Sequence, residues 1–306
     1  MIRHFFHSAW KRRVTRFRLR YLVLGFWATA MVALGSCHSL VSSSQATPAS
    51  SLYFIGNSLT DEVLYKGFDD MVESQGRPLE WGRHMIPGAP LEWIFEHPND
   101  GFREEPYGTY PQAFANYTWD YVTLQPTNRL LNDDLTTIAQ FLDLLKERSP
   151  EAQVFIYAQW PGNDGQDWDT QWLHEYTDRW DGTQRTRDYY ETLTQTLNEQ
   201  HPNFSPFRLI PVGHVMYALN QKMKAGEIPG FTKITDVYID RGHLNSVGSY
   251  IVATTFYATI FQSSPIGLPV PPPYQEDQPI SDELAAVIQN TVWDVVTTTP
   301  LSGVTP

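Results

Sequence analysis

Short apolar runs alternate along this chain with segments in which apolar residues recur three and four positions apart. A short apolar run bounded by turn residues is typical of a buried strand, and the second pattern is typical of an amphipathic helix. The predicted strands cover residues 52–55, 79–86, 119–124, 153–158 and 207–212. The predicted helices cover residues 61–75, 134–148, 183–200, 246–262 and 281–298. This order predicts one α/β domain over residues 51–306, a three-layer α/β/α sandwich around a parallel sheet.

A basic stretch and an apolar run of 14 residues, 21–34, open the chain. This length suits the core of a signal peptide and is short for a membrane span, which needs about 20 residues. The run ends in Leu-Gly-Ser-Cys, which resembles a bacterial lipobox and implies that Cys37, the only cysteine, is lipidated. We therefore expect a lipoprotein signal peptide over 1–37 and a flexible tether over 38–50. The protein would be exported and anchored in a membrane of the cell envelope, in the periplasm or at the cell surface. An uncleaved anchor, or cleavage at a plain small-residue site, would export it too.

The charge is distributed unevenly. Residues 1–37 hold seven Lys or Arg and no Asp or Glu, so the rest carries 15 basic and 34 acidic residues, a net charge of −19. So acidic a body repels phosphate backbones, and nucleic acid is therefore not an expected partner. The carboxylates of 163–169 do not have the spacing of an EF-hand loop, so we expect these residues to form a solvated loop. We expect neither a metal nor a cofactor.

Residues suited to acyl transfer follow the first three predicted strands, at the edge of the sheet where such folds bind ligands. Ser58 offers a hydroxyl and its own backbone N–H, which suits a nucleophile with a built-in oxyanion donor. Gly88 offers an unshielded N–H, and Asn128 offers an amide. Each also has an ordinary structural explanation, as a helix N-cap, a turn glycine and a turn asparagine.

Near the end of the chain, Asp240 and His243 are three residues apart. This spacing allows the carboxylate to bond Nδ1 of the imidazole, which leaves Nε2 free to accept a proton. A structural His–Asp pair is the alternative. Taken together, the residues at the strand ends provide a nucleophile, a base, an acid that orients the base, and oxyanion donors.

The order Gly-Asn-Ser-Leu, an isolated Gly, an Asn and then Asp-x-x-His resembles the SGNH (GDSL-like) hydrolase superfamily over residues 51–262. The resemblance implies a flavodoxin-like fold with sheet order 2-1-3-4-5. It implies that Ser58 is the nucleophile, His243 the base and Asp240 the residue that orients the base. It also implies an oxyanion hole made by the backbone N–H groups of Ser58 and Gly88 and by the Asn128 side chain.

The chain departs from the usual family motifs at two places. Asn57 stands where Gly-Asp-Ser is commoner, and Pro-Thr-Asn-Arg at 126–129 replaces Gly-x-Asn-Asp. The second departure weakens the assignment of Asn128 and leaves Gln125 as the alternative amide donor.

We therefore expect a serine esterase that hydrolyses small acyl esters, and we favour acetyl esters of a polysaccharide or envelope glycan as its substrates. Four tryptophans within 160–180 suggest sugar binding, which we assign to Trp160, Trp168 and Trp172. The alternative is that they cap the core from a long insertion. A lipase or thioesterase, and a catalytically silent glycan-binding or envelope-assembly lipoprotein, are the alternatives. Candidates of lower rank near the site are Trp93, His97 and Arg129.

Overall fold

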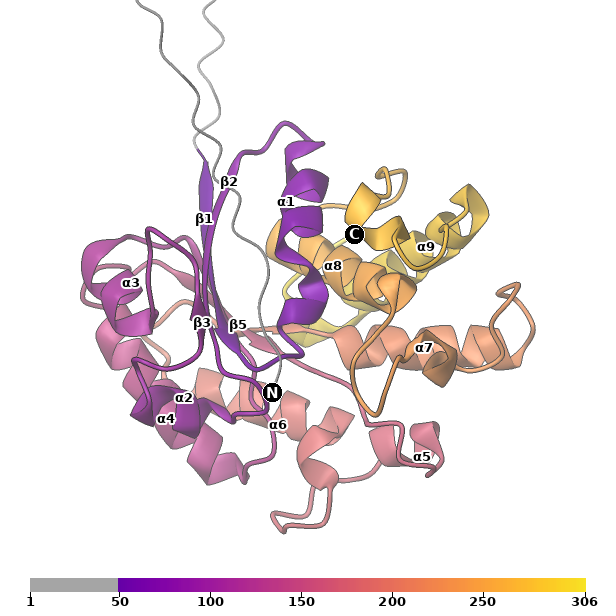
Figure 1. Ribbon diagram of the computed structural model, residues 1–306. Coiled ribbons are helices and arrows are strands. Elements are labelled where there is room, and N and C mark those ends of the chain that lie inside the picture. The colour runs from indigo at the N-terminus through magenta and orange to yellow at the C-terminus, as the bar shows by residue number, and fades with distance from the viewer. Residues whose placement is uncertain (1–48) are drawn as a thin grey trace, which may run out of the picture. The chain divides into compact units, whose positions relative to one another are not determined.

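The computed structural model describes residues 49–306 (Figure 1). The predicted signal peptide with Cys37 and nearly all of the predicted tether lie outside the described residues, so export and lipidation stay predictions. Within 49–306, no helix is long and apolar enough to cross a membrane.

A six-stranded sheet forms the centre of the fold, in the order β3-β2-β1-β4-β5-β6. Neighbouring strands are parallel except β2 and β3, which are antiparallel. Without β3, this is the predicted order 2-1-3-4-5, and the predicted fold class is confirmed. Residues 102–103 escaped prediction because a two-residue exposed edge strand leaves no apolar run in the sequence. The strands are β1 (Ser50–Gly56), β2 (Leu79–Met85), β3 (Phe102–Arg103), β4 (Tyr121–Leu124), β5 (Gln153–Tyr157) and β6 (Arg208–Ile210).

Helices cover both faces of this sheet (Figure 1). Helices α2, α3, α4 and α6 lie on one face, and α1, α7, α8 and α9 lie on the other. The short helices α2, α3 and α5 were not predicted, because one or two turns show too little periodicity. Helix α7, of 13 residues, also lies outside the predicted helix ranges, and its first residue, Val212, was predicted to end a strand. The helices are α1 (Tyr65–Glu73), α2 (Leu91–Glu96), α3 (Tyr110–Asn116), α4 (Leu131–Leu145), α5 (Trp168–Trp172), α6 (Arg187–Gln200), α7 (Val212–Lys224), α8 (Ser246–Ile260) and α9 (Asp282–Thr298).

Helix α8 is buried along its whole length, between the sheet and helices α7 and α9. A helix that is apolar all round has no polar face to turn to water. Its buried hydroxyls at Thr254, Thr255 and Thr259 donate to the carbonyl four residues earlier, which satisfies them without any outside partner. Residues at the start of α8 are therefore held firmly against the sheet.

Strand β1 lies in the middle of the sheet and pairs with both β2 and β4. The hydrogen bonds continue one residue past the strand ends, from the Ile86 N–H to the Gly56 carbonyl and from the Gln125 N–H to the Ile55 carbonyl. The loops that follow β1, β2 and β4 consequently leave the sheet side by side. These are the loops that carry Ser58, Gly88 and Asn128.

Candidate active site

The loop after β1 turns sharply and carries Ser58. The Thr60 N–H bonds the Asn57 carbonyl at 2.8 Å, and the Asp61 N–H bonds the Ser58 carbonyl at 3.2 Å. A Cβ at Gly56 would come within 2.0 Å of Thr60 Oγ1, so only glycine fits where the strand meets this turn. The turn leaves Ser58 partly exposed at the carboxyl end of β1.

The structure brings His243 to Ser58 across 185 residues of sequence. Nε2 of His243 lies 2.9 Å from Oγ of Ser58, and Nδ1 lies 2.7 Å from Oδ2 of Asp240. Both distances are those of hydrogen bonds, so the three predicted residues form a continuous chain from carboxylate to hydroxyl. A free Nε2 facing a hydroxyl is the arrangement that proton removal requires.

Asp240 also shapes the loop that carries His243. Its Oδ1 accepts the backbone N–H groups of Gly242 at 2.7 Å and His243 at 2.8 Å, while Oδ2 faces the imidazole. These bonds to the charged carboxylate lower the pKa of Asp240 to about 2. Asp240 is therefore ionised at neutral pH and fixes both the loop and the ring.

Two backbone donors lie at the ends of neighbouring loops. Within the described residues, the N–H groups of Ser58 and Gly88 have no hydrogen-bond partner. Gly88 has a φ of +69°, in a turn closed by the bond from the Ala89 N–H to the Ile86 carbonyl. Pro87 followed by a glycine at positive φ is typical of a type II turn. Both N–H groups are available to a ligand.

Asn128 and Gln125 differ in what their amides can do. Gln125 is buried, and its Nε2 donates to Asn57 Oδ1 at 3.0 Å and to Gln159 Oε1 at 2.9 Å, so both amide hydrogens are used. Asn128 is exposed, with its Oδ1 accepting from Nε of Arg185 at 2.8 Å. Because a guanidinium can only donate, this contact fixes which end of the amide is oxygen, and Nδ2 has no partner within 49–306. The structure favours Asn128 over Gln125 as an oxyanion donor.

A buried amide network lies beneath these loops. The Asn57 N–H donates to Gln125 Oε1, and Asn57 Nδ2 donates to the Ala89 carbonyl at 3.2 Å. Gln159 Nε2 donates to Thr127 Oγ1 at 2.6 Å, next to Asn128. The departure at position 57 thus has a structural use, because an aspartate could not donate to the Ala89 carbonyl. The network ties together the loops after β1, β2, β4 and β5.

The prediction that Trp160, Trp168 and Trp172 bind substrate is wrong. All three are buried, at 1%, 5% and 0% exposure, so none offers a ring face to a sugar. Trp160 donates to the Gly242 carbonyl and Trp168 to the Tyr238 hydroxyl, so two of the indoles support the loop that carries His243. The alternative explanation, a core-capping insertion, is the one that the structure bears out.

The lower-ranked candidates and the fourth tryptophan of 160–180, Trp180, fall in different places. Trp180 and Trp93 are 62% and 49% exposed. The Trp93 ring stacks on that of His97, with centroids 3.8 Å apart, and Arg129 forms an ion pair with Glu92 on α2. Of these side chains, the two exposed tryptophans keep surface on which a sugar could stack.

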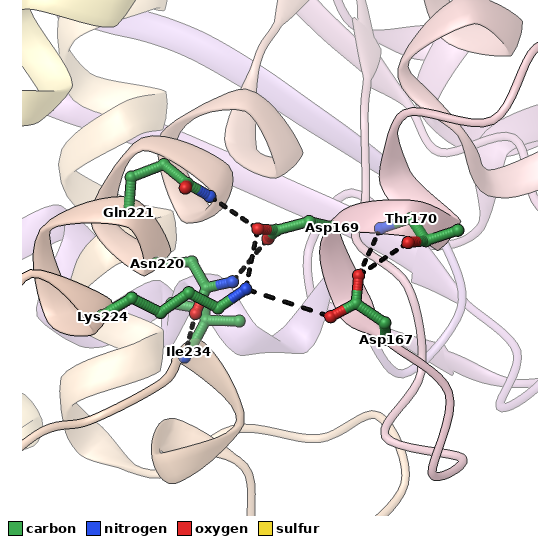
Figure 2. Close-up of polar contacts among 7 residues, drawn as sticks. All are labelled: Asp167, Asp169, Thr170, Asn220, Gln221, Lys224 and Ile234. Atoms are coloured by element: carbon green, nitrogen blue, oxygen red, sulfur yellow. Dashed lines mark hydrogen bonds and ion pairs between the residues drawn. The ribbon is translucent and has the colours of Figure 1, made fainter.

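The carboxylates within 163–169 hold the insertion to the body of the protein (Figure 2). Asp169 accepts from Asn220, Gln221 and Lys224 of α7, while Asp167 caps α5 by accepting from Thr170. The polar sequence suggested a solvated loop, but these hydrogen bonds anchor the insertion to α7.

Glu62, four positions after Ser58, was missed in the sequence, where it directly follows Asp61 and nothing marks it as buried. It is 8% exposed, accepts from the Ser249 hydroxyl at 3.0 Å, and lines the same cavity of about 370 Å³ as Ser58 and His243. Burial raises its pKa to about 7, against the opposing effects of the Ser249 hydroxyl and nearby His243.

We expect Glu62→Gln to stabilise the protein at pH 8 but not at pH 5. Because the pKa is raised to about 7, the folded chain binds more protons than the unfolded one above about pH 4.5, and wild-type stability falls until pH passes 7. Glutamine keeps the acceptor without a charge. At ~1.4 kcal/mol per pKa unit, the gain at pH 8 is at most about 3 kcal/mol, a melting-temperature rise of several degrees. Thermal melts at both pH values test this, and an equal difference at the two would contradict it.

Comparisons with known proteins place this geometry in a known fold. No family model matches the chain, and no curated protein matches it either. Among solved structures, a DUF4886 family protein from Bacteroides uniformis has a TM-score of 0.60 and 16% identity, over 82% of this chain and 96% of that one.

Two further solved structures have TM-scores of 0.43. One, from Slackia heliotrinireducens, is provisionally described as an SGNH hydrolase and is 19% identical over 70% of this chain and 100% of its own. The other is a carbohydrate esterase family 3 protein from Talaromyces cellulolyticus, 13% identical over 70% of this chain and 97% of its own. The chain thus shares the fold of the Bacteroides uniformis protein, and its structural neighbours include proteins described as SGNH hydrolases, GDSL-like lipases and carbohydrate esterases.

Proposed function

We propose that this chain is a serine esterase of the SGNH type. The observation that supports this most directly is the unbroken contact from Asp240 through His243 to Ser58, at 2.7 and 2.9 Å. Beside it lie two backbone N–H groups that have no partner within residues 49–306. A hydroxyl, a base oriented by a carboxylate and donors for a developing oxyanion are together what acyl transfer needs.

The reaction proceeds in two steps. His243 Nε2 takes the Ser58 proton as Oγ attacks the carbonyl carbon, and the carbonyl oxygen becomes an oxyanion that the Ser58 and Gly88 N–H groups and the Asn128 amide bind. The imidazolium, held by Asp240, returns the proton to the alcohol oxygen as the C–O bond breaks. Water then attacks the acyl-enzyme, with His243 again accepting and returning the proton, which frees the carboxylic acid and Ser58.

The surroundings of Ser58 support a short acyl group. The cavity beside it is lined by Leu64, Leu244 and Pro273 and by four acidic side chains, Asp61, Glu62, Glu276 and Asp277. A long hydrocarbon chain in this cavity would take the carboxylates out of water without offering them a partner, which costs free energy. We therefore favour acetyl esters of a glycan over lipids, at the cell envelope where the predicted signal would deliver the protein.

A fluorophosphonate probe tests the nucleophile directly. Residues 49–306 and their Ser58→Ala variant would be treated with the probe, followed by intact mass, and assayed on 4-nitrophenyl acetate. We expect one adduct and ester turnover in the parent protein and neither in the variant. Absence of both from the parent, with a folded protein by circular dichroism, would contradict the esterase proposal and favour a silent glycan-binding protein.

A further inference from the structure

A second polar cavity, which we call the Arg185 pocket, lies at the same edge of the sheet. Its volume is about 120 Å³, well above the roughly 10–15 Å³ that one water molecule needs, so several atoms of a ligand fit. It adjoins the triad, because Arg241 follows Asp240 directly and Asn128 follows the strand next to β1. Its lining includes Asn128, Gly162, Asp164, Gln171, Arg185 and Arg241.

Arg185 is the unusual member of this lining. Its side chain is partly buried, and it makes no ion pair with any carboxylate in the part of the chain that the structure describes. Nε donates to Asn128, and the other four guanidinium N–H groups have no partner there. Taking a guanidinium partly out of water without an acidic partner is costly, so an anionic ligand would be a favourable addition.

The pocket has a rigid frame. Thr183 and Gln184, just before Arg185, are buried, and Gln184 donates to the Arg179 carbonyl. Elsewhere in the lining, Asp164 accepts from Gln171 at 3.0 Å. The α5 segment that carries Gln171 is fastened to α7 through Asp169 (Figure 2). Preorganised donors lose little entropy when a ligand binds.

The second arginine connects this frame to the triad loop. The Arg241 carbonyl accepts from the Asn163 N–H at 2.7 Å, which places the insertion against the loop that carries His243. The Arg241 side chain is 78% exposed, and its guanidinium lies 3.9 Å from the Asp164 carboxylate, a distance that leaves most of its donors to solvent. With two arginines and one aspartate, the lining has a net charge of +1 within a strongly acidic body.

We propose that the Arg185 pocket binds the carboxylate of an acidic sugar in the substrate, so that the esterase prefers acyl groups carried on uronates. This rests on the proposed function and adds the substrate class to it. A guanidinium matches a carboxylate in two parallel hydrogen bonds, and a single negative charge balances the lining, whereas a phosphate dianion would exceed it.

Three matched substrates test the proposal. They are methyl 2-O-acetyl-galactopyranosides that differ only at C6, which is a carboxylate, a hydroxymethyl or a phosphorylated hydroxymethyl group. For wild type we expect kcat/KM on the uronate to exceed that on the neutral sugar roughly 10- to 100-fold, the range for a hydrogen bond to a charged group. In Arg185→Gln this ratio should fall towards one, whatever the absolute rate, and Arg185→Lys should restore part of it.

A matched control and a binding measurement keep the outcomes distinct. Arg148→Gln removes an exposed arginine at the opposite edge of the sheet and should leave the ratio unchanged. Equal rates on uronate and neutral sugar, or a preference for the phosphate, would overturn the proposal while leaving the esterase intact. If no substrate is hydrolysed, ligand-observed NMR on a mixture of the Ser58→Ala variant and the unacetylated methyl galacturonoside tests whether the pocket binds the uronate. Binding that is lost in the Ser58→Ala/Arg185→Gln double variant supports the pocket, and absence of binding rejects it.

Discussion

Replacing His243 with alanine is expected to lower kcat on an activated acetate ester by roughly 10⁴–10⁶. The Ser58 hydroxyl is a poor nucleophile unless a base takes its proton, and His243 Nε2 is the base within hydrogen-bond distance of it. The leaving alcohol also loses its proton donor. KM should change much less, because the imidazole contributes mainly to the transition state. Steady-state kinetics with purified protein measure both values.

His201→Ala is a suitable control, because His201 caps the far end of α6, away from the triad loop. It should keep kcat within a factor of about two, as expected for a substitution outside the site. A His243→Ala variant that retained a tenth or more of wild-type kcat would mean that another group removes the Ser58 proton.

Asn128→Asp is expected to lower kcat by at least about 10²–10³, the usual cost of losing one oxyanion donor. Aspartate keeps the size of the side chain, tolerates the positive φ of 51° and can still accept from Arg185. It removes both Nδ2 hydrogens and adds a negative charge beside the oxyanion. Thermal melts of the variant would confirm that the loop is intact, and kinetics on 4-nitrophenyl acetate would measure the loss.

Asn128→Gly separates the two effects, because glycine also adopts positive φ but removes the donor without adding charge. A loss of about 10²-fold in both variants would assign the amide to the oxyanion hole. If the glycine variant kept kcat within about threefold, the hole would consist of the Ser58 and Gly88 N–H groups alone, and the assignment of Asn128 would be wrong.

The sequence was sufficient for the sheet and for the spacing of the triad because both depend on local patterns. Apolar runs mark β1, β2, β4, β5 and β6, and the three-residue spacing of Asp240 and His243 already permits their hydrogen bond. Predicting the first strand was enough to place Ser58 at its carboxyl end. The alternation of strands and helices predicted a parallel sheet, but the strand order and the pairing of Ser58 with His243 came from the family resemblance.

Local sequence patterns could not predict which side chains are buried or which distant residues they contact. The tryptophans at 160, 168 and 172 lie among polar residues in sequence, yet their rings are covered by segments distant in the chain, among them α7 and the loop before α8. Gln125 and Asn128 look alike as amide donors until their partners are known. The raised pKa of Glu62 and the donors of Arg185 that lack a partner within 49–306 depend on residues distant in the chain, which the periodicity of the sequence does not reveal.

The buried amides of Asn57, Gln125 and Gln159 have a consequence for protein engineering. Because each amide completes the hydrogen bonds of a neighbour, the loops after β1, β2, β4 and β5 depend on one another and can be replaced only together. Grafting one of them from a relative would leave donors or acceptors unmatched in the interior, at a cost of about 1–3 kcal/mol for each. Recombination of this scaffold should therefore move the four loops as a set and treat the helices behind them as the variable parts.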